Sequence, residues 1–118
     1  MAIVSSHTLN GVDGTHAGGI GVSLSRILDD GGRARVFEAE MDDGGRLSQT
    51  VDLTGADPSS PYEMVFATGP YWAARQSAPH RCQIMGEVVV RFVMPDADAK
   101  YHIPVILSPN SYSVWWSS

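Results

Sequence analysis

The sequence predicts an all-β protein, and a β-sandwich in particular. Apolar and polar residues alternate with a period of two through most of the chain, as they do in half-buried strands. Turn signals of the Asp-Gly and Asn-Gly type separate these runs at short intervals, notably at residues 29–32 and 42–45. About eight strands and one small helix in a chain of 118 residues are typical of a sandwich.

The predicted strands follow one another without a linker or an internal repeat. Residues 87–94 (EVVVRFVM) form the strongest, with Val88, Val90 and Phe92 on one face. The other strands are expected at residues 3–9, 20–28, 33–39, within 47–53, and at 62–67, 101–107 and 111–116. Residues 1–118 are therefore expected to form one domain.

One segment, residues 71–76 (YWAARQ), has the character of a helix. Thr68 precedes it as a possible N-terminal cap, and Pro70 lies near its first turn, where proline is tolerated. The sequence thus predicts a single short helix between two strands.

Composition narrows the class of partner. A hydrophobic content of 43% with 18% charged residues fits a globular protein, and the net charge of -5 without a basic cluster excludes a nucleic-acid binder. No apolar run approaches the roughly 18 residues of a membrane span, and no signal pattern opens the chain. Cys82, the one cysteine, forms no internal disulfide. We expect a cytoplasmic protein that contacts no membrane.

Histidine is the informative residue type. His7 shares a strand face with Ser5, and His102 lies in the strand at 101–107. A neutral imidazole accepts a proton near pH 7, so two converging histidines can activate water, although a histidine in a strand is more often structural. His16 and His80 fall in loops and are expected to be solvated.

Two further positions have two interpretations each. Pro104 interrupts a strand pattern, which indicates either a bulge beside His102 or an edge strand, because proline has no N–H to donate. Arg46 follows the turn at 42–45, which we predict to be a hairpin tip. There its guanidinium either binds a carbonyl or anion, or is a solvated charge.

No motif points to a metal or a cofactor. The glycines at 18–21 open a strand and not a helix, the wrong context for a phosphate loop. His80 and Cys82 are close in sequence, but no second pair completes a zinc site. The expectation is a site that uses neither metal nor cofactor.

Four segments together resemble the 5-hydroxyisourate hydrolase family, the enzymatic relatives of transthyretin. The resemblance runs in order over nearly the whole chain, and its most specific part is the H-x-P-x-x-L-S-P run that begins at His102. The segments are Ser-His-Thr-Leu-Asn at 6–10, Asp-Asp-Gly-Gly-Arg at 42–46, Phe-Ala-Thr-Gly-Pro-Tyr-Trp-Ala-Ala at 66–74 and Tyr-His-Ile-Pro-Val-Ile-Leu-Ser-Pro at 101–109.

The resemblance implies a transthyretin-like sandwich of two four-stranded sheets and a homotetramer, a dimer of dimers with sites at the dimer–dimer interface. It also implies cofactor-independent ring opening of 5-hydroxyisourate, a small-molecule substrate from purine metabolism. His7, Arg46 and His102 fall on the family's catalytic positions. Two imidazoles would activate water while the guanidinium holds and polarises the substrate.

The C-terminus departs from this family. Trp115, Trp116, Ser117 and Ser118 stand where its enzymes have Tyr-Arg-Gly-Ser, and we predict that these four residues contact the substrate. Two indoles replace a phenol and a guanidinium, which removes a charge and adds apolar surface. Two alternatives therefore stay open: a repurposed member acting on another aromatic or heterocyclic substrate, for example in a biosynthetic pathway, and a non-catalytic small-molecule carrier.

Overall fold

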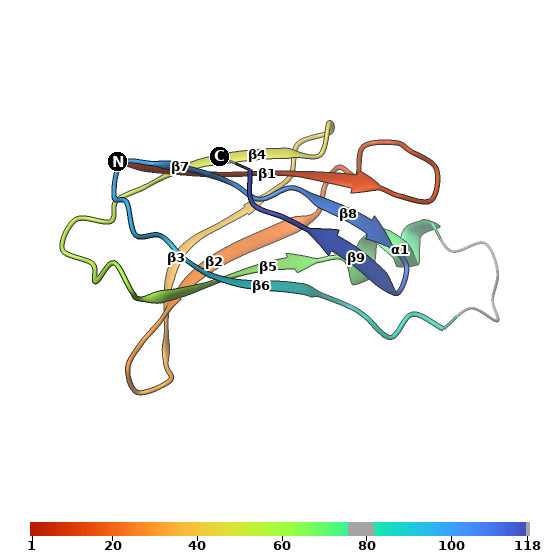
Figure 1. Ribbon diagram of the computed structural model, residues 1–118. Helices are drawn as coiled ribbons and strands as arrows, with labels where there is room; N and C mark the ends of the chain where they lie inside the picture. The colour runs from red at the N-terminus through yellow and green to blue at the C-terminus, as the bar shows by residue number, and fades with distance from the viewer. Residues whose placement is uncertain (76–81, 118) are drawn as a thin grey trace.

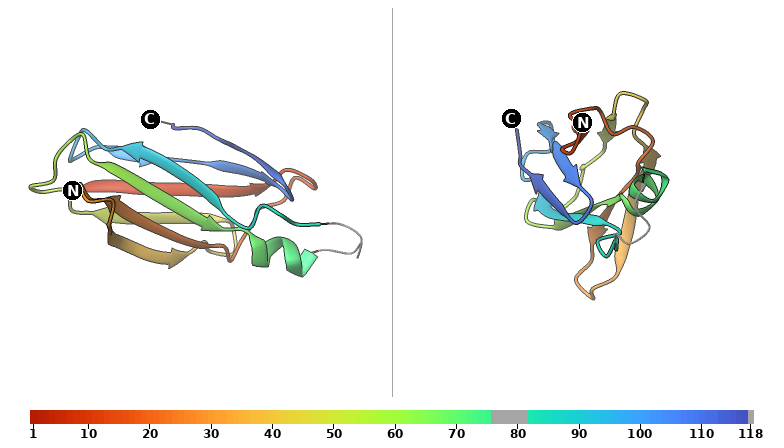
Figure 2. Two further views of the ribbon diagram at one scale, coloured as in Figure 1. Left: turned by 90° about the horizontal axis from the view of Figure 1, so that it is seen from below. Right: turned by 90° about the vertical axis from the view of Figure 1, so that its right-hand side faces the viewer.

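The fold is a sandwich of two sheets, as predicted (Figure 1). The structure is a computed structural model and describes residues 1–75 and 82–117. One sheet has the order β4-β1-β8-β9, with β7 also paired to β1, and the other has the order β3-β2-β5-β6. Because β7 and β8 lie one after the other along β1, each sheet has four rows of strands. Seen end-on, the two sheets form separate layers (Figure 2).

The elements agree closely with the predicted ranges, with one predicted strand divided in two. In chain order they are β1 Ala2–Asn10, β2 Gly21–Ile27, β3 Arg33–Glu40, β4 Arg46–Val51, β5 Pro61–Ala67, α1 Gly69–Arg75, β6 Val88–Val93, β7 Lys100–His102, β8 Val105–Ser108 and β9 Ser111–Val114. The described residues contain no helix with the length and apolar character that a membrane crossing requires.

β1 is the central strand of its sheet and pairs on both sides. It runs antiparallel to β4 and parallel to β7 and β8. Its side chains alternate strictly between buried and half-buried positions. The buried side carries Ser6, Thr8 and Asn10 as well as Ala2 and Val4, so much of this strand's inner face is polar.

Each buried polar group on β1 has a partner. The Ser6 hydroxyl donates to the carbonyl of Ile103 at 2.6 Å, and the Thr8 hydroxyl donates to the carbonyl of Ala17 at 2.6 Å. Asn10 Nδ2 donates to the Tyr71 hydroxyl of α1 at 3.0 Å. A buried polar group is costly unless it is bonded, so these contacts allow the polar face to point inward.

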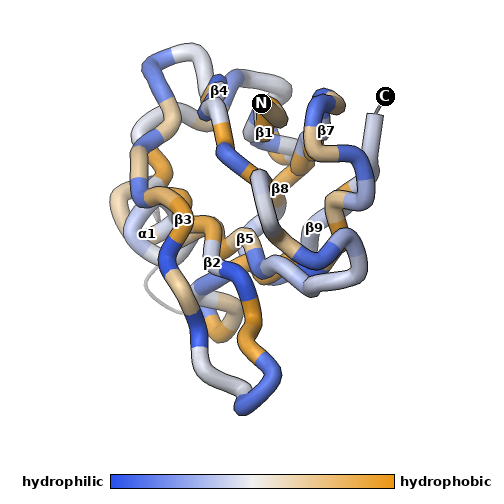
Figure 3. The backbone as a smooth tube through the Cα atoms, turned by 90° about the vertical axis from the view of Figure 1, so that its left-hand side faces the viewer, coloured by the Kyte–Doolittle hydropathy of each residue, from blue (hydrophilic) through white to orange (hydrophobic). Residues whose placement is uncertain are grey.

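Both sheets contribute apolar side chains to one core between them. The fully buried members include Val4, Val105 and Leu107 from one sheet, and Leu24, Met64 and Phe66 from the other. Charged and polar residues gather at the tip of the β2–β3 hairpin, which projects away from the core (Figure 3). The helix α1 lies at the end of the sandwich toward which β1 runs (Figure 1).

The turn at residues 42–45 is not the hairpin tip that the sequence predicts, so that prediction is wrong. β3 and β4 belong to different sheets, so this turn carries the chain from one layer to the other. The Thr8 N–H of β1 donates to the Gly45 carbonyl at 2.8 Å, which holds the crossover against the central strand. The pattern of turn residues marks a reversal but does not say which strands it joins.

Pro104 produces neither a bulge nor an edge along β1. Ser5 lies opposite His102 and Thr8 opposite Val105, so the register is the same before and after the proline. The Pro104 carbonyl accepts the Trp115 N–H at 3.5 Å. Pro104 has no N–H, so it cannot donate a second hydrogen bond back to Trp115. Proline therefore separates β7 from β8 by weakening the ladder to the C-terminal segment.

We predict that Gly45→Ala destabilises the protein more than Gly14→Ala. Both glycines have positive φ, of 73° and 78°, so each substitution costs about 1–2 kcal/mol of unfolding free energy from the backbone alone. A Cβ at Gly45 would lie 2.5 Å from the Thr8 carbonyl oxygen, whereas one at Gly14 meets nothing within 4 Å. Overpacking should add roughly 1–3 kcal/mol at Gly45, measured by urea unfolding. Equal losses would contradict the close contact.

Candidate functional site

His7 and Arg46 are direct neighbours on the outer face of the β1 sheet. They form a cross-strand pair in the antiparallel register of β1 and β4. His7 is half-buried and Arg46 is exposed. Their side chains point away from the core because Ser6 and Leu47, one residue along each strand, are buried.

The turn before β4 fixes the position of the Arg46 backbone at the start of that strand. Asp42 Oδ1 accepts the backbone N–H of Gly44 and the backbone N–H of Arg46, each at 2.9 Å. The Asp42 N–H in turn donates to the Arg46 carbonyl at 3.0 Å. An aspartate that binds the backbone after it closes a turn of this kind, so this motif positions the arginine as well as reversing the chain.

His102 lies on the same face and is held by Ser5. The two residues are partners in the parallel register of β1 and β7, and Ser5 Oγ lies 2.8 Å from His102 Nδ1. This hydrogen bond engages Nδ1 and leaves Nε2 as the nitrogen that can meet a ligand. His7, two residues beyond Ser5, is close enough to His102 for the two rings to interact electrostatically.

His16 is exposed to solvent, as the sequence predicts, but it also contacts His7. His16 Nδ1 lies 2.9 Å from His7 Nε2, and the two rings stack with centroids 4.9 Å apart. His16 is exposed in the β1–β2 connection, but an antiparallel bridge pairs it with Leu9. The sequence signal for this contact is the Asn10-Gly11 turn, which reverses the chain and brings His16 back alongside β1 on the same face as His7.

Four influences lower the pKa of His7 below its ordinary value. Partial burial is the largest, because it disfavours the charged ring, followed by the charge of Arg46 and by electrostatic repulsion between the two rings of His7 and His16. A backbone hydrogen bond to Gly44 acts in the opposite direction, and His102 adds a smaller lowering. The environment thus favours a neutral imidazole, the form that accepts a proton.

The C-terminal segment continues the pairing along β7 and β8. Val114 lies opposite Val105, and Ser117 bridges His102, with the Ser117 N–H donating to the His102 carbonyl at 2.8 Å. Adjacent side chains of an extended segment point to opposite faces. This register places Trp115 and Ser117 on the histidine face and Trp116 on the other side.

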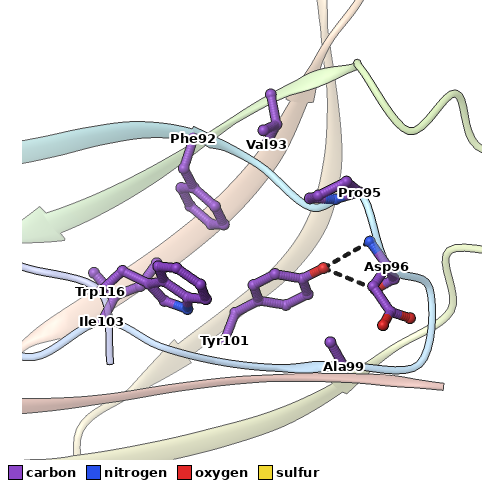
Figure 4. Close-up of a pocket in the computed structure, with 8 residues that line it drawn as sticks. All are labelled: Phe92, Val93, Pro95, Asp96, Ala99, Tyr101, Ile103 and Trp116. Carbon is purple, nitrogen blue, oxygen red and sulfur yellow. Dashed lines mark hydrogen bonds between the residues drawn. The ribbon is translucent and has the colours of Figure 1, made fainter. Parts of the chain in front are cut away.

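Trp116 lines a separate apolar cavity of about 620 Å³ between β6 and β7 (Figure 4). Its indole lies among Phe92, Ile103 and the ring of Tyr101. The Tyr101 hydroxyl donates to the Asp96 carbonyl at 2.8 Å and accepts its N–H at 2.9 Å. The two tryptophans that we grouped as substrate contacts therefore face different parts of the molecule.

The structure brings together His7, Arg46 and His102, with Trp115 and Ser117 beside His102. The predictions for Ser118 and for His80 lie outside the described residues. In residues 1–75 and 82–117, no three His, Cys, Asp or Glu side chains gather as a metal site would require. The arrangement offers imidazoles for proton transfer, a guanidinium for a carbonyl or anion, and hydroxyls that orient them.

Comparisons with known proteins agree with this architecture. A family model, Transthyretin (HIUase/Transthyretin family), matches residues 4–116. The 5-hydroxyisourate hydrolase of Pseudomonas aeruginosa is 32% identical over 120 residues, which span 100% of this chain and 93% of that protein. Transthyretin from Sparus aurata has a TM-score of 0.77 at 25% identity, covering 97% of this chain and 95% of that one. (S)-Allantoin synthase has a TM-score of 0.78 at 24% identity, covering 99% of this chain but 44% of that chain, so it is similar in fold alone.

We predict that His7 titrates below the roughly 6.5 of an exposed histidine, and that Arg46→Met raises its pKa. The increase should be partial, because burial, the larger cause, remains. Arg46→Lys keeps the positive charge and should leave the pKa low. NMR titration of the His7 ring measures this pKa in wild type, Arg46→Met and Arg46→Lys. An identical pKa in wild type and Arg46→Met would contradict the assigned role of the guanidinium.

Proposed function

Since the chain belongs to the HIUase/Transthyretin family, we propose that it is a hydrolase that opens 5-hydroxyisourate, or a closely similar cyclic ureide, with water. One observation carries this proposal: pairing with β1 brings His7, Arg46 and His102 to the same face of one sheet. The full-length similarity to 5-hydroxyisourate hydrolases supports the reaction type.

In the proposed mechanism, an imidazole takes a proton from water as the water oxygen attacks a ring carbonyl carbon. His102 is the better placed base, because Ser5 engages its Nδ1 and leaves Nε2 for the water. The bond between that carbon and the ring nitrogen then breaks, the carbon keeps the new oxygen as a carboxylic acid, and the nitrogen takes up the proton. Each step conserves atoms and needs no oxidant.

Arg46 would bind the substrate and polarise its carbonyl. Its guanidinium is exposed on the face beside His7, so a substrate can reach it. A planar donor fork suits the oxygen-rich edge of a ureide, and it stabilises the negative charge that develops on the carbonyl oxygen. His7, kept neutral by its surroundings, would serve as the second proton carrier.

The assembly is part of the proposal. The site residues lie on an open sheet face, and β6 and β9 are edge strands of their sheets. Edge strands can pair with a second copy of the chain, and a facing sheet from another pair would cover the histidine face. We therefore propose a homotetramer, a dimer of dimers with its sites between facing sheets.

The proposed activity predicts rapid loss of the absorbance of freshly generated 5-hydroxyisourate when the protein is added. His102→Ala and Arg46→Ala should each lower kcat/KM by roughly 10²- to 10⁴-fold, the usual contribution of a positioned general base or charge clamp. Thr50→Ala is the matched control, since Thr50 is exposed on the same strand and face as Arg46.

A rate equal to that of buffer, unchanged by His102→Ala, would contradict the hydrolase. Binding of a small heterocycle that survives His7→Ala and His102→Ala without turnover would instead identify a carrier.

A second candidate is a family member acting on a more aromatic heterocycle. The observation that favours it is Trp115, whose 44% exposed indole shares the face of His102. An indole stacks on a flat ring and offers one N–H donor, which suits an aromatic substrate better than a small oxygen-rich one. The proton-transfer groups would be the same in both cases.

For this second candidate, Trp115→Tyr should raise turnover of 5-hydroxyisourate by roughly tenfold, within the range of a single pocket substitution. Trp116→Arg should have a smaller effect on turnover, because that side chain lines the cavity beside Phe92 and Ile103. Steady-state kinetics of both variants measure turnover, and thermal unfolding shows whether a change in turnover comes from a loss of stability. Unchanged turnover in Trp115→Tyr would argue against the second candidate.

A further inference from the structure

His16 is placed with precision although it lies outside the strands. The residues on either side of it are tied to β1: the Asn10 N–H donates to the Thr15 carbonyl at 2.8 Å, and the Ala17 N–H donates to the Thr8 carbonyl at 2.9 Å. The buried Thr8 hydroxyl also donates to the Ala17 carbonyl. The antiparallel bridge from Leu9 to His16 then puts the His16 side chain on the outer face, beside His7.

The turn before His16 is also closed by side chains. Asn10 Oδ1 accepts the Val12 N–H at 2.9 Å and the Asp13 N–H at 3.3 Å. Asp13 Oδ1 accepts both the N–H and the hydroxyl of Thr15, at 2.9 and 2.6 Å. A connection with this many internal bonds presents the imidazole from a defined backbone.

The contact between the two rings constrains His7 in two ways. The hydrogen bond between His16 Nδ1 and His7 Nε2 engages that nitrogen of His7, so one of the two rings must donate and the other accept. The stack at 4.9 Å, with the ring planes 28° apart, restricts rotation of the His7 ring. The tautomer of a histidine is set by the hydrogen bond that one of its nitrogens makes.

We propose that His16 is a positioning residue for His7, holding its imidazole in one orientation and one tautomer through the Nε2 hydrogen bond and the ring stack. This proposal rests on the proposed function insofar as it concerns catalysis, but the state of the His7 ring can be measured without substrate. Among residues 1–75 and 82–117, Arg46 from β4 and His102 from β7 are the other charged or titratable groups that act on His7.

Two variants separate the parts of the contact. His16→Phe keeps a ring for stacking and removes the hydrogen bond, and His16→Ala removes both. Val12→Ala is the matched control, because Val12 is 67% exposed in the same connection and its turn contact uses the backbone N–H. Nitrogen-15 NMR of the His7 ring reports the tautomer and its titration, and kcat/KM for 5-hydroxyisourate is measured across the same pH range.

In both His16 variants, we expect the His7 nitrogen shifts to move toward a mixture of tautomers, and the His7 titration to move to higher pH because the electrostatic repulsion from His16 is lost. The acid limb of the kcat/KM profile should follow it to higher pH. At pH 7, kcat/KM should fall roughly tenfold, a fraction of the roughly 10²- to 10⁴-fold contribution of a positioned base.

Val12→Ala should match wild type in every measurement. Unchanged His7 shifts in both His16→Phe and His16→Ala would overturn the positioning role, whatever the activity. A wild-type protein that does not hydrolyse 5-hydroxyisourate, combined with shifted His7 resonances in the variants, would refute the proposed function and support the role of His16.

Discussion

The register of β1 is the constraint on which the rest of the molecule depends. Pairing with β4 on one side and with β7 and β8 on the other places His7 opposite Arg46 and Ser5 opposite His102. A slip of one residue would turn every side chain of β1 to the other face of the sheet. The site would then be buried and the polar inner residues would face solvent.

Hydrogen bonds to the inner face hold this register more specifically than apolar burial can. Ser6 and Thr8 reach backbone carbonyls, and Asn10 reaches the Tyr71 hydroxyl of α1. Each of these bonds contributes only about 0.5–1.5 kcal/mol in place, but leaving its buried group unpaired costs more. The inner face of β1 therefore fits only one arrangement of neighbouring strands. The same arrangement determines which residues lie beside His7 and Ser5 on the outer face.

The histidine face concentrates groups that can carry positive charge. Arg46, His16 and His102 all lie near His7, and this proximity together with burial keeps the pKa of His7 low. Such a face attracts an electron-rich ligand, and the low pKa of His7 keeps that imidazole neutral near pH 7. The low pKa of His7 also makes the fold less stable as the pH falls through the ordinary range of histidine, since the unfolded chain then binds the proton more readily.

Local pattern was enough to determine the strands, the short helix, the turn that precedes Arg46, and the fact that His7 and Ser5 share a face. These features depend on alternation and turn chemistry, which act between residues close in sequence. Resemblance of ordered segments to a known family predicted the sandwich and the three residues that the sheet brings together.

Only the tertiary structure decided which face of β1 is buried, because Ile3 and Leu9 on one side and Val4 on the other give no clear apolar side. It also made the turn at 42–45 a crossover between sheets and brought His16 onto His7. Long-range pairing likewise sent Trp115 and Trp116 to opposite sides of the C-terminal segment. Periodicity defines two faces of a strand, but only the partners across the sheet and the core determine what each face meets.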